Sequence, residues 1–337
     1  MKKKIIILKN DRIGDLFASL KAINCILNNH KENDITIFLS NINHKFGFLF
    51  SKVKKRIFSS NLSLYEKIKI FYYFTLNKID SAYILTPKNF YYYLPFFFRK
   101  TKFYGITIKS KRNRPNRFLK KYLYKEVTLD RVNIKKRFTS CSALLQESLV
   151  KEDLNYNFLI NTNHILSHNF SLPQNYVFFH YKHDLFARLL GWDFKKIKEF
   201  LFFLKIKYEC LLFSSELNNN LANNFFYDNF NSYNFKNHKI NKINNNNIFF
   251  LKEIEGYDLF DVVRNSKKII APEGIMTQMG YFLNKSVFAL LHFNLRNRQD
   301  FINQIISCKE WFPPNNYKYA VLKKDFYKSI KKIEKRI

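Results

Sequence analysis

The order of apolar segments at the start of the chain constrains the fold more than any other feature. Residues 5–8 are four consecutive apolar residues, which is typical of a strand covered on both faces in a parallel sheet. Apolar residues then recur at the helical intervals of 4, 3 and 4, at Leu16, Leu20, Ile23 and Leu27. A second apolar run follows at residues 35–39. This order of strand, helix and strand predicts a βαβ unit.

The first half of the chain continues this alternation. Residues 81–86 repeat the strand pattern, and residues 102–106 supply a further strand before a basic, irregular stretch at 109–117. Polar residues, Pro173 and paired asparagines at 161–175 then predict a boundary. We therefore expect a first Rossmann-like domain at residues 1–165.

The same rhythm restarts after that boundary. Residues 176–180 and 209–213 have strand patterns, and between them Asp193 can cap a helix. An asparagine-dense stretch at 218–247 is predicted to be an insertion around one helix. Strand and helix patterns then alternate over residues 248–251, 257–265, 268–271, 275–283 and 287–291. These segments predict a second Rossmann-like domain at residues 170–315.

The last residues, 316–337, have the pattern of a basic amphipathic helix. Their apolar residues form a helical stripe flanked by lysines: Leu322, Phe326, Ile330, Ile333 and Ile337.

The composition excludes several classes of protein. The apolar runs are too short for a bilayer span, and the chain is too long for a small disulfide scaffold. The residues Cys25, Cys141, Cys210 and Cys308 show no metal-ligand spacing, so we expect reduced thiols in a cytoplasmic protein and no metal site. The apolar run of residues 5–8 ends too soon for a secretion signal.

The net charge of +32, from 58 basic and 26 acidic residues, would ordinarily indicate nucleic acid or an anionic membrane as partner. Lys, Asn, Ile, Phe and Tyr are all abundant while Gly and Pro number 7 each, so part of this charge is attributed to AT-rich codon usage. Residues 90–98 form an aromatic run followed by Arg99, Lys100 and Lys102. A buried helix is the favoured prediction for this run, and contact with a membrane surface is the alternative.

Two loops are candidates for chemistry, because ligands of doubly wound sheets bind outside the carboxyl ends of strands. The first loop joins the first strand to its helix and carries Asn10, Asp11, Arg12, Gly14 and Asp15. From spacing alone, a helix cap is the favoured role for Asp15, and a catalytic role is the alternative.

Residues 4–15, which end in Ile-Gly-Asp, resemble the opening of glycosyltransferase family 9, the bacterial heptosyltransferase family. Residues 271–286 are similar to the donor-site motif of that family, with Glu273 where Asp is usual and Gln278 where His is expected. His180, the segment 191–193 and the segment 214–216 occur in the order found in the family.

The resemblance implies a GT-B fold, in which two Rossmann-like domains face each other across a cleft and the helix at 316–337 packs back on the first domain. It implies that the first domain binds the acceptor, that Asn10, Asp11, Arg12 and Gly14 form the loop on the acceptor side, and that Asp15 is the catalytic base. The residues implied to bind the donor lie in the second domain: Lys182, Arg188, Glu216, Glu273, Gly274, Ile275, Met276 and Gln278. The structural alternatives to these donor-binding roles are capped turns, a carboxylate that caps a helix at Glu216, and surface charge at Lys182 and Arg188.

The function expected from this resemblance is an inverting, metal-independent transfer of a sugar. The expected donor is ADP-heptose, and the expected acceptor is lipopolysaccharide or a related glycolipid at the inner face of the cytoplasmic membrane. We expect a monomer that needs no cofactor and binds no nucleic acid. Two alternatives stay open: a basic nucleic-acid-binding protein, although no such motif is present, and a degenerate family member that binds a nucleotide sugar without fast turnover.

Overall fold

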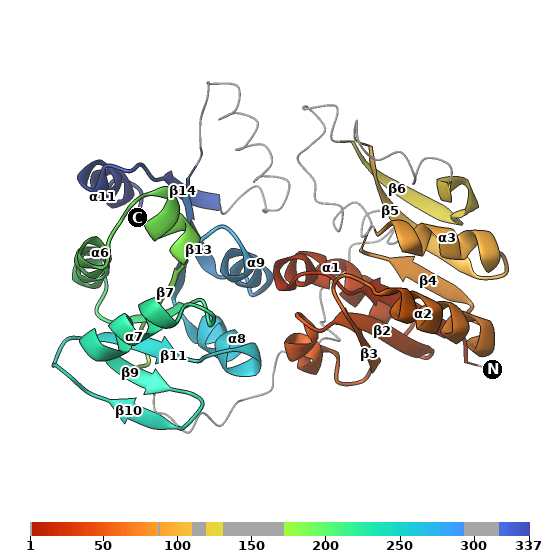
Figure 1. The fold of residues 1–337 in the computed structure, drawn as a ribbon, viewed down its shortest axis with the longest axis horizontal. Helices are drawn as coiled ribbons and strands as arrows, with labels where there is room; N and C mark the ends of the chain where they lie inside the picture. Colours follow the sequence, from red (N-terminus) through yellow and green to blue (C-terminus); the bar gives the residue numbers. More distant parts are fainter. Residues whose placement is uncertain (1, 87, 110–118, 131–171, 293–316) are drawn as a thin grey trace. The chain divides into compact units, whose positions relative to one another are not determined.

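The structure is a computed structural model and describes residues 2–86, 88–109, 119–130, 172–292 and 317–337. These residues form two compact units, one made of residues 2–130 and the other of residues 172–292 with 317–337 (Figure 1). Each unit contains one sheet flanked by helices. The boundary predicted at 161–175 falls almost wholly outside the described residues.

The N-terminal unit is built on a six-stranded sheet in which every pairing is parallel. Its strands lie in the order β3-β2-β1-β4-β5-β6, which is the Rossmann order. The strands and helices are β1 (Lys4–Lys9), α1 (Ile13–Asn29), β2 (Asp34–Ser40), β3 (Lys54–Phe58), α2 (Leu64–Asn77), β4 (Ser81–Ile84), α3 (Asn89–Phe97), β5 (Lys102–Lys109) and β6 (Lys125–Asp130), with short 3-10 helices at His44–Phe50 and Lys120–Tyr122.

The predicted βαβ unit is confirmed. Residues 5–8 are at most 1% exposed, because β1 lies between β2 and β4 and both of its faces are covered. The predicted stripe of Leu16, Leu20, Ile23 and Leu27 is buried along α1. A strand therefore forms here because a continuous apolar run can be buried on both faces only in the middle of a parallel sheet.

The C-terminal unit repeats this plan with one addition. Its sheet has the order β10-β9-β11-β8-β7-β12-β13-β14, and only the β9–β10 pairing is antiparallel. Without that hairpin, the strands again follow the Rossmann order. The elements are β7 (Val177–Tyr181), a π-helix (Asp184–Leu189), α6 (Phe194–Lys207), β8 (Leu211–Ser215), α7 (Asn220–Asn229), β9 (Asn231–Asn234), β10 (Lys239–Asn241), β11 (Ile248–Lys252), α8 (Gly256–Asn265), β12 (Lys268–Pro272), α9 (Ile275–Phe282), β13 (Ser286–Leu291), β14 (Tyr317–Val321) and α11 (Phe326–Glu334).

The asparagine-dense stretch at 218–247 is part of the sheet as well as a helix, which corrects the predicted insertion around one helix. After α7, β9 pairs with β11 and β10 folds back on β9. Asn231 is 2% exposed and closes this hairpin: its side-chain amide donates to the carbonyls of Asn244 and Asn246, and its side-chain oxygen accepts the N–H of Ile243 at 2.7 Å. Asparagine provides in one side chain the donors and the acceptor that the turn requires.

The prediction of one helix over residues 316–337 was wrong, because the segment contains β14 as well as α11. The apolar stripe that was predicted to pack on the first domain is buried in the core of the C-terminal unit. Phe326 and Ile333 are buried in the core of that unit, and the rings of Phe326 and Trp192 lie 4.9 Å apart. Because α6 and β7 already offer apolar surface beside Trp192, the stripe is buried within its own unit.

The aromatic run at 90–98 forms α3, and the prediction of a buried helix is confirmed for one of its faces. Tyr91, Tyr92 and Leu94 are fully buried, while Phe96 and Phe97 are exposed. No helix in the described part of the chain is both long enough and apolar enough to cross a bilayer. Cys25 and Cys210 are buried, unpaired thiols, and Cys141 and Cys308 lie outside the described residues.

Candidate active site

The strand order locates a candidate site in each unit. In the N-terminal sheet the order reverses at β1, which has β2 on one side and β4 on the other. In the C-terminal sheet it reverses at β7, between β8 and β12. Ligands of such sheets bind at the carboxyl ends of the strands where this reversal leaves a crevice. The carboxyl ends of β1 and β7 are therefore where functional side chains are expected.

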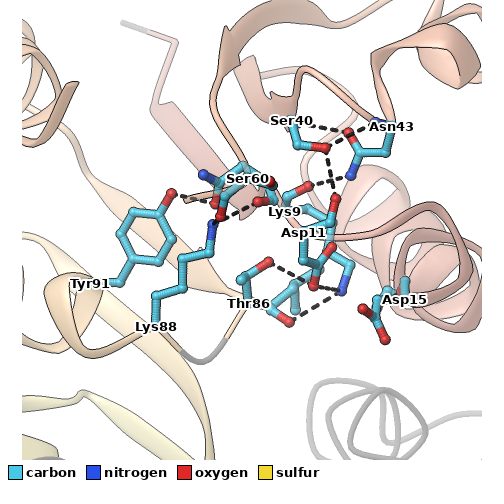
Figure 2. A network of polar contacts seen from close by, with 12 residues as sticks. Lys9, Asp11, Asp15, Ser40, Asn43, Ser60, Thr86, Lys88 and Tyr91 are labelled. Atoms are coloured by element: carbon cyan, nitrogen blue, oxygen red, sulfur yellow. Dashed lines mark hydrogen bonds and ion pairs between the residues drawn. The ribbon is translucent and has the colours of Figure 1, made fainter. Parts of the chain in front are cut away.

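At the end of β1, a buried ion pair links the first loop to β4 (Figure 2). Lys9 is 3% exposed, and its Nζ lies 2.7 Å from Oδ2 of Asp11 and 3.4 Å from the carbonyl of Leu85. The same Asp11 oxygen accepts the hydroxyl of Thr86 at 3.0 Å. Loops that are 75 residues apart in the sequence are thus joined at the carboxyl edge of the sheet.

A second set of contacts fixes Asn10. Its side-chain oxygen accepts the hydroxyl of Tyr91 at 2.6 Å, its amide donates to the carbonyl of Ser59, and its own carbonyl accepts from Nζ of Lys88 at 2.7 Å. Lys88 also donates to the carbonyl of Ser60. Burial lowers the pKa of Lys88 to about 8. Asn10 is fully buried, so within the predicted acceptor-side loop its side chain holds the backbone in place.

The end of β2 completes the support of this loop. The side-chain amide of Asn43 donates to the carbonyl of Lys9 at 2.9 Å, and the hydroxyl of Ser40 donates to the carbonyl of Asp11 at 2.7 Å. Lys9 is the last residue of β1 and Asp11 lies between β1 and α1, so these side chains satisfy carbonyls at the point where the regular strand ends. The loop therefore has side-chain partners from three directions, which restricts the backbone that carries the first turn of α1.

Asp15 lies in that first turn and is half-buried. Burial raises the pKa of its carboxyl group, and the negative charge of Asp11 acts in the same direction. The charges of Lys9 and Arg12 and the backbone N–H of Arg12 oppose this rise. In Figure 2 no dashed contact joins Asp15 to the other residues drawn. Asp11 is thus held in a network, whereas the carboxylate of Asp15 lies beside it with a raised pKa.

The other two residues predicted on the acceptor side differ in exposure. Arg12 is the N-cap residue of α1, is exposed and makes no side-chain cap. Gly14 is the second residue of α1 and half-buried. The prediction that Asp15 caps the helix is therefore modified. Arg12 occupies the N-cap position of α1, and Asp15 lies three residues later, where the helix N-terminus stabilises the negative charge of a carboxylate.

In the C-terminal unit, the turn between β12 and α9 corresponds to the predicted phosphate cradle. Gly274 has a φ of 151°, a conformation that L side chains rarely adopt. Its N–H donates to the hydroxyl of Thr277 at 3.1 Å, so this N–H is already engaged, contrary to the predicted contact with a diphosphate. Ile275 and Met276 begin α9, and Glu273 is exposed. The cradle is therefore reduced to the first turn of α9.

Gln278 and Gly280 lie further along α9, and Gly280 is on the side that packs against the sheet. Gln278 is only 9% exposed, so it forms part of the packed helix. A Cβ added at Gly280 would lie 2.6 Å from both Ile269 and Val287, on β12 and β13. The glycine thus permits close packing of α9 on the sheet, which sets the position of the turn before it.

The ends of β7 and β8 bring four further side chains together. Nδ1 of His180 lies 3.0 Å from the hydroxyl of Ser214, its neighbour across the two strands. The N–H of His183 donates to Oε2 of Glu216 at 2.9 Å. Lys182 lies between the two histidines and is half-buried. Glu216 and Lys182 are therefore placed at the carboxyl edge, as predicted for residues that contact the donor, although one oxygen of Glu216 holds the backbone.

Arg188 is less suited to the predicted role. It lies on the π-helix, is 69% exposed, and pairs with Asp184 at 3.4 Å. An exposed pair of this kind contributes little free energy. Among the predicted donor-binding residues, Arg188 therefore matches the alternative of surface charge.

His180 should make the stability of the C-terminal unit depend on pH. Burial lowers the pKa of His180 to about 4, and Lys182 adds to this effect. Because the unfolded chain binds a proton near pH 6.5 and the folded unit does not, stability should fall by up to ~3 kcal/mol as the pH drops from 6.5 to 4. Urea unfolding followed by hydrogen exchange of β7 peptides measures this loss. His180→Gln should remove most of it, and an unchanged pH dependence in that variant would contradict the assignment.

Among the described residues, no three His, Cys, Asp or Glu side chains gather as a metal site.

Comparisons with known proteins bear on the fold. No protein-family model and no curated protein sequence matches the chain. Among solved structures, ADP-heptose LPS heptosyltransferase II of E. coli has a TM-score of 0.60 and 15% identity, with 96% of this chain and 90% of that chain covered. The glycosyl transferase family 9 protein of Veillonella parvula has a TM-score of 0.57 and 13% identity, with 99% and 90% covered.

The chain has the GT-B fold of the heptosyltransferases. A UDP-N-acetylglucosamine 2-epimerase is also similar, with a TM-score of 0.52, 11% identity and coverage of 99% of this chain and 87% of that chain. One fold thus occurs with different reactions, so the reaction has to be argued from the site.

Within this GT-B chain, several residues of the site were not identified from the sequence. Lys9, Thr86 and Lys88 were missed because lone polar residues near a strand end carry no periodic signal. Their importance arises from the β1–β4 pairing, which brings residues 9–11 beside residues 85–88. Thr86 ends the strand predicted at 81–86 and Lys88 follows it, and that position at a carboxyl end was the available signal.

Proposed function

We propose that this chain is a glycosyltransferase that moves a sugar from a nucleoside-diphosphate sugar onto a glycolipid. The proposed donor is ADP-heptose and the proposed acceptor is lipopolysaccharide or a related glycolipid. Both choices are supported by the fold shared with a heptosyltransferase whose name includes ADP-heptose and LPS. We further propose an inverting transfer without a metal, by a monomer at the inner face of the cytoplasmic membrane.

The observation that carries the proposal is the state of Asp15. An inverting transfer needs a base that accepts the proton of the acceptor hydroxyl as its oxygen attacks the anomeric carbon. Asp15 offers a half-buried carboxylate at the crevice of the first sheet. Burial raises its pKa, which strengthens it as a base, while Lys9 and Arg12 favour the ionised form that can accept a proton.

The C-terminal unit offers groups for the donor. The N–H groups of Ile275 and Met276 at the start of α9 suit the departing diphosphate, whose negative charge a helix N-terminus favours. Lys182 adds a positive charge at the same edge of the sheet. Glu216 and Glu273 would accept hydrogen bonds from the ribose and sugar hydroxyls. Stabilisation of the negative charge that develops on the departing diphosphate lowers the barrier to transfer.

We expect a nucleotide sugar to stabilise the folded protein. A ligand at a concentration of 100 Kd adds about 2.7 kcal/mol of stability, so a thermal-shift screen of ADP-, UDP- and GDP-sugars should give the largest rise in Tm with ADP-heptose. Ile275→Pro removes one N–H at the first helical position, where proline is tolerated, and should reduce that rise without unfolding α9. The ADP-sugar titration of wild type and variant measures the effect.

The two alternatives give different results in the same experiment. A chain that responds to no nucleotide sugar but binds RNA with a steep salt dependence would be a nucleic-acid-binding protein. A chain that binds ADP-heptose and transfers nothing would be a degenerate member. An Ile275→Pro variant with an unchanged response would contradict the location proposed for the diphosphate.

A further inference from the structure

Helix α2 presents an apolar stripe to solvent. Only Ile70 and Phe74 of its 14 residues are buried. Six apolar side chains between 38% and 73% exposed lie on the rest of the helix, and we refer to them as the outer stripe: Leu64, Tyr65, Ile68, Phe71, Tyr72 and Leu76. A helix that packs on a sheet normally buries its large apolar residues and exposes polar ones. Here a second apolar face is left uncovered.

The outer stripe has the geometry of a helix that lies in a membrane interface. With 100° between successive residues, its members fall within an arc of about 140°, opposite the buried Ile70 and Phe74. Lys67 and Lys69 border the arc on its two sides, and Nζ of Lys69 lies 4.2 Å from the centre of the Tyr65 ring. Apolar and aromatic residues on one face with lysines along the edges are characteristic of interfacial helices.

Helix α3 extends this apolar surface. Phe96 and Phe97 are 41% and 58% exposed, and the rings of Phe97 and Phe71 lie 5.3 Å apart. The apolar surface is therefore continuous from α2 to α3.

A basic hollow of about 1040 Å³ adjoins the two helices. Phe96 and Phe97 line one part of it, so it borders the apolar surface directly. Its charged lining residues are Lys3, Lys78, Arg99, Lys100, Lys102 and one carboxylate, Asp80. An excess of cations beside exposed aromatic rings matches the order of phosphate and hydrocarbon in a lipid monolayer.

We propose that the outer stripe, together with Phe96 and Phe97, docks on the surface of an anionic phospholipid bilayer. The apolar side chains enter the region below the headgroups, and the cations of the hollow lie against lipid phosphates. A lipid surface fits better than a protein partner, because protein interfaces are depleted in lysine, whereas lysines border this stripe and extend to anionic headgroups. The net charge of +32 favours the same partner.

The surface has a direct structural connection to the candidate site. The turn before α2 carries Ser59 and Ser60, whose carbonyls accept from Asn10 and Lys88. Helix α2 begins four residues after Ser60, so the outer stripe starts beside the turn that contacts the first loop. In this respect the inference rests on the proposed function, since a glycolipid acceptor is carried by a membrane.

Sedimentation of the full chain with vesicles tests the proposal. We expect binding to vesicles of equal parts phosphatidylglycerol and phosphatidylcholine and little binding to phosphatidylcholine alone. Ile68→Glu with Tyr72→Glu should lower the bound-to-free ratio at least about tenfold, because two apolar contacts are lost and two negative charges are added. The matched control is Ile206→Glu with Leu221→Glu, two residues on α6 and α7 that are 79% and 68% exposed, and it should change binding less than about twofold.

Three results would overturn the proposal. The first is equal vesicle binding by the outer-stripe variant and the wild type. The second is an equal loss of vesicle binding in the control variant. The third is a wild-type dimer in gel filtration that becomes a monomer in the outer-stripe variant, which would show that a second copy of the chain covers this face. Hydrogen exchange in β1 and β4 verifies that each variant is folded. The vesicle assay needs no sugar, so the two proposals can fail separately. A wild-type protein that binds ADP-heptose but not the anionic vesicles refutes only this inference, and one that binds the vesicles but no nucleotide sugar refutes only the proposed function.

Discussion

Asp15→Asn should reduce sugar transfer by about 100- to 10,000-fold, the range of the contribution of general base catalysis. The amide keeps the size of the side chain but cannot accept the proton of the acceptor hydroxyl. The fold should survive, because Asp15 is half-buried and lies outside the Lys9–Asp11 network. Turnover of ADP-heptose with a lipopolysaccharide acceptor measures kcat, and a thermal shift with ADP-heptose shows whether donor binding is retained.

Asp34→Asn provides a matched control. Asp34 is an aspartate of the same unit, at the start of β2 rather than at the carboxyl edge of the sheet, and pairs with the exposed Lys54. This change should leave kcat within about twofold, because exposed pairs contribute little. The raised pKa of Asp15 also predicts that kcat/KM of the wild type falls on the acid side as this carboxyl group gains a proton. Normal turnover in Asp15→Asn would refute its role as the base.

Lys9→Met should destabilise the N-terminal unit by about 3 to 5 kcal/mol, the range observed when one partner of a buried ion pair is removed. Lys9 is 3% exposed and Asp11 16% exposed, so the variant leaves the carboxylate of Asp11 buried without its cation. Because this pair also joins β1 to the turn after β4, we expect the loss to be visible as faster hydrogen exchange in both strands. Urea unfolding followed by exchange of β1 and β4 peptides measures it.

Two further variants separate the loss of the pair from a general effect of removing lysine. Lys9→Met with Asp11→Leu should recover most of the lost stability, because no charge is then left buried. Lys54→Met breaks the exposed pair with Asp34, in which the lysine is 70% exposed, and should cost no more than ~0.5 kcal/mol. Equal losses from Lys9→Met and Lys54→Met would contradict the importance assigned to burial.

The candidate site was predictable only to the level of its loops. The position of the β1–α1 and β12–α9 loops at strand ends indicated where ligands bind, and the resemblance indicated Asp15 and the turn at Glu273. The burial and the hydrogen bonds of individual groups were not predictable. Examples are the burial of Asn10 and Gln278 and the hydrogen bond from the N–H of Gly274 to Thr277. These differences depend on packing against residues far away in the sequence, such as Tyr91 for Asn10.

The sequence by itself determined the alternation of strands and helices in each unit and the central strands of both sheets, whereas β3, β6, β9, β10, β14 and helix α2 were not predicted. Apolar runs such as residues 5–8 and helical stripes such as that of α1 are local patterns, and burial of such patterns has few solutions. Only the tertiary structure decided that α11 packs beside Trp192, that α2 keeps an apolar face exposed, and that Lys9 and Lys88 hold the first loop. The physical reason is that a stripe or a charge specifies that a partner is needed, whereas the strand order determines which partner is within reach.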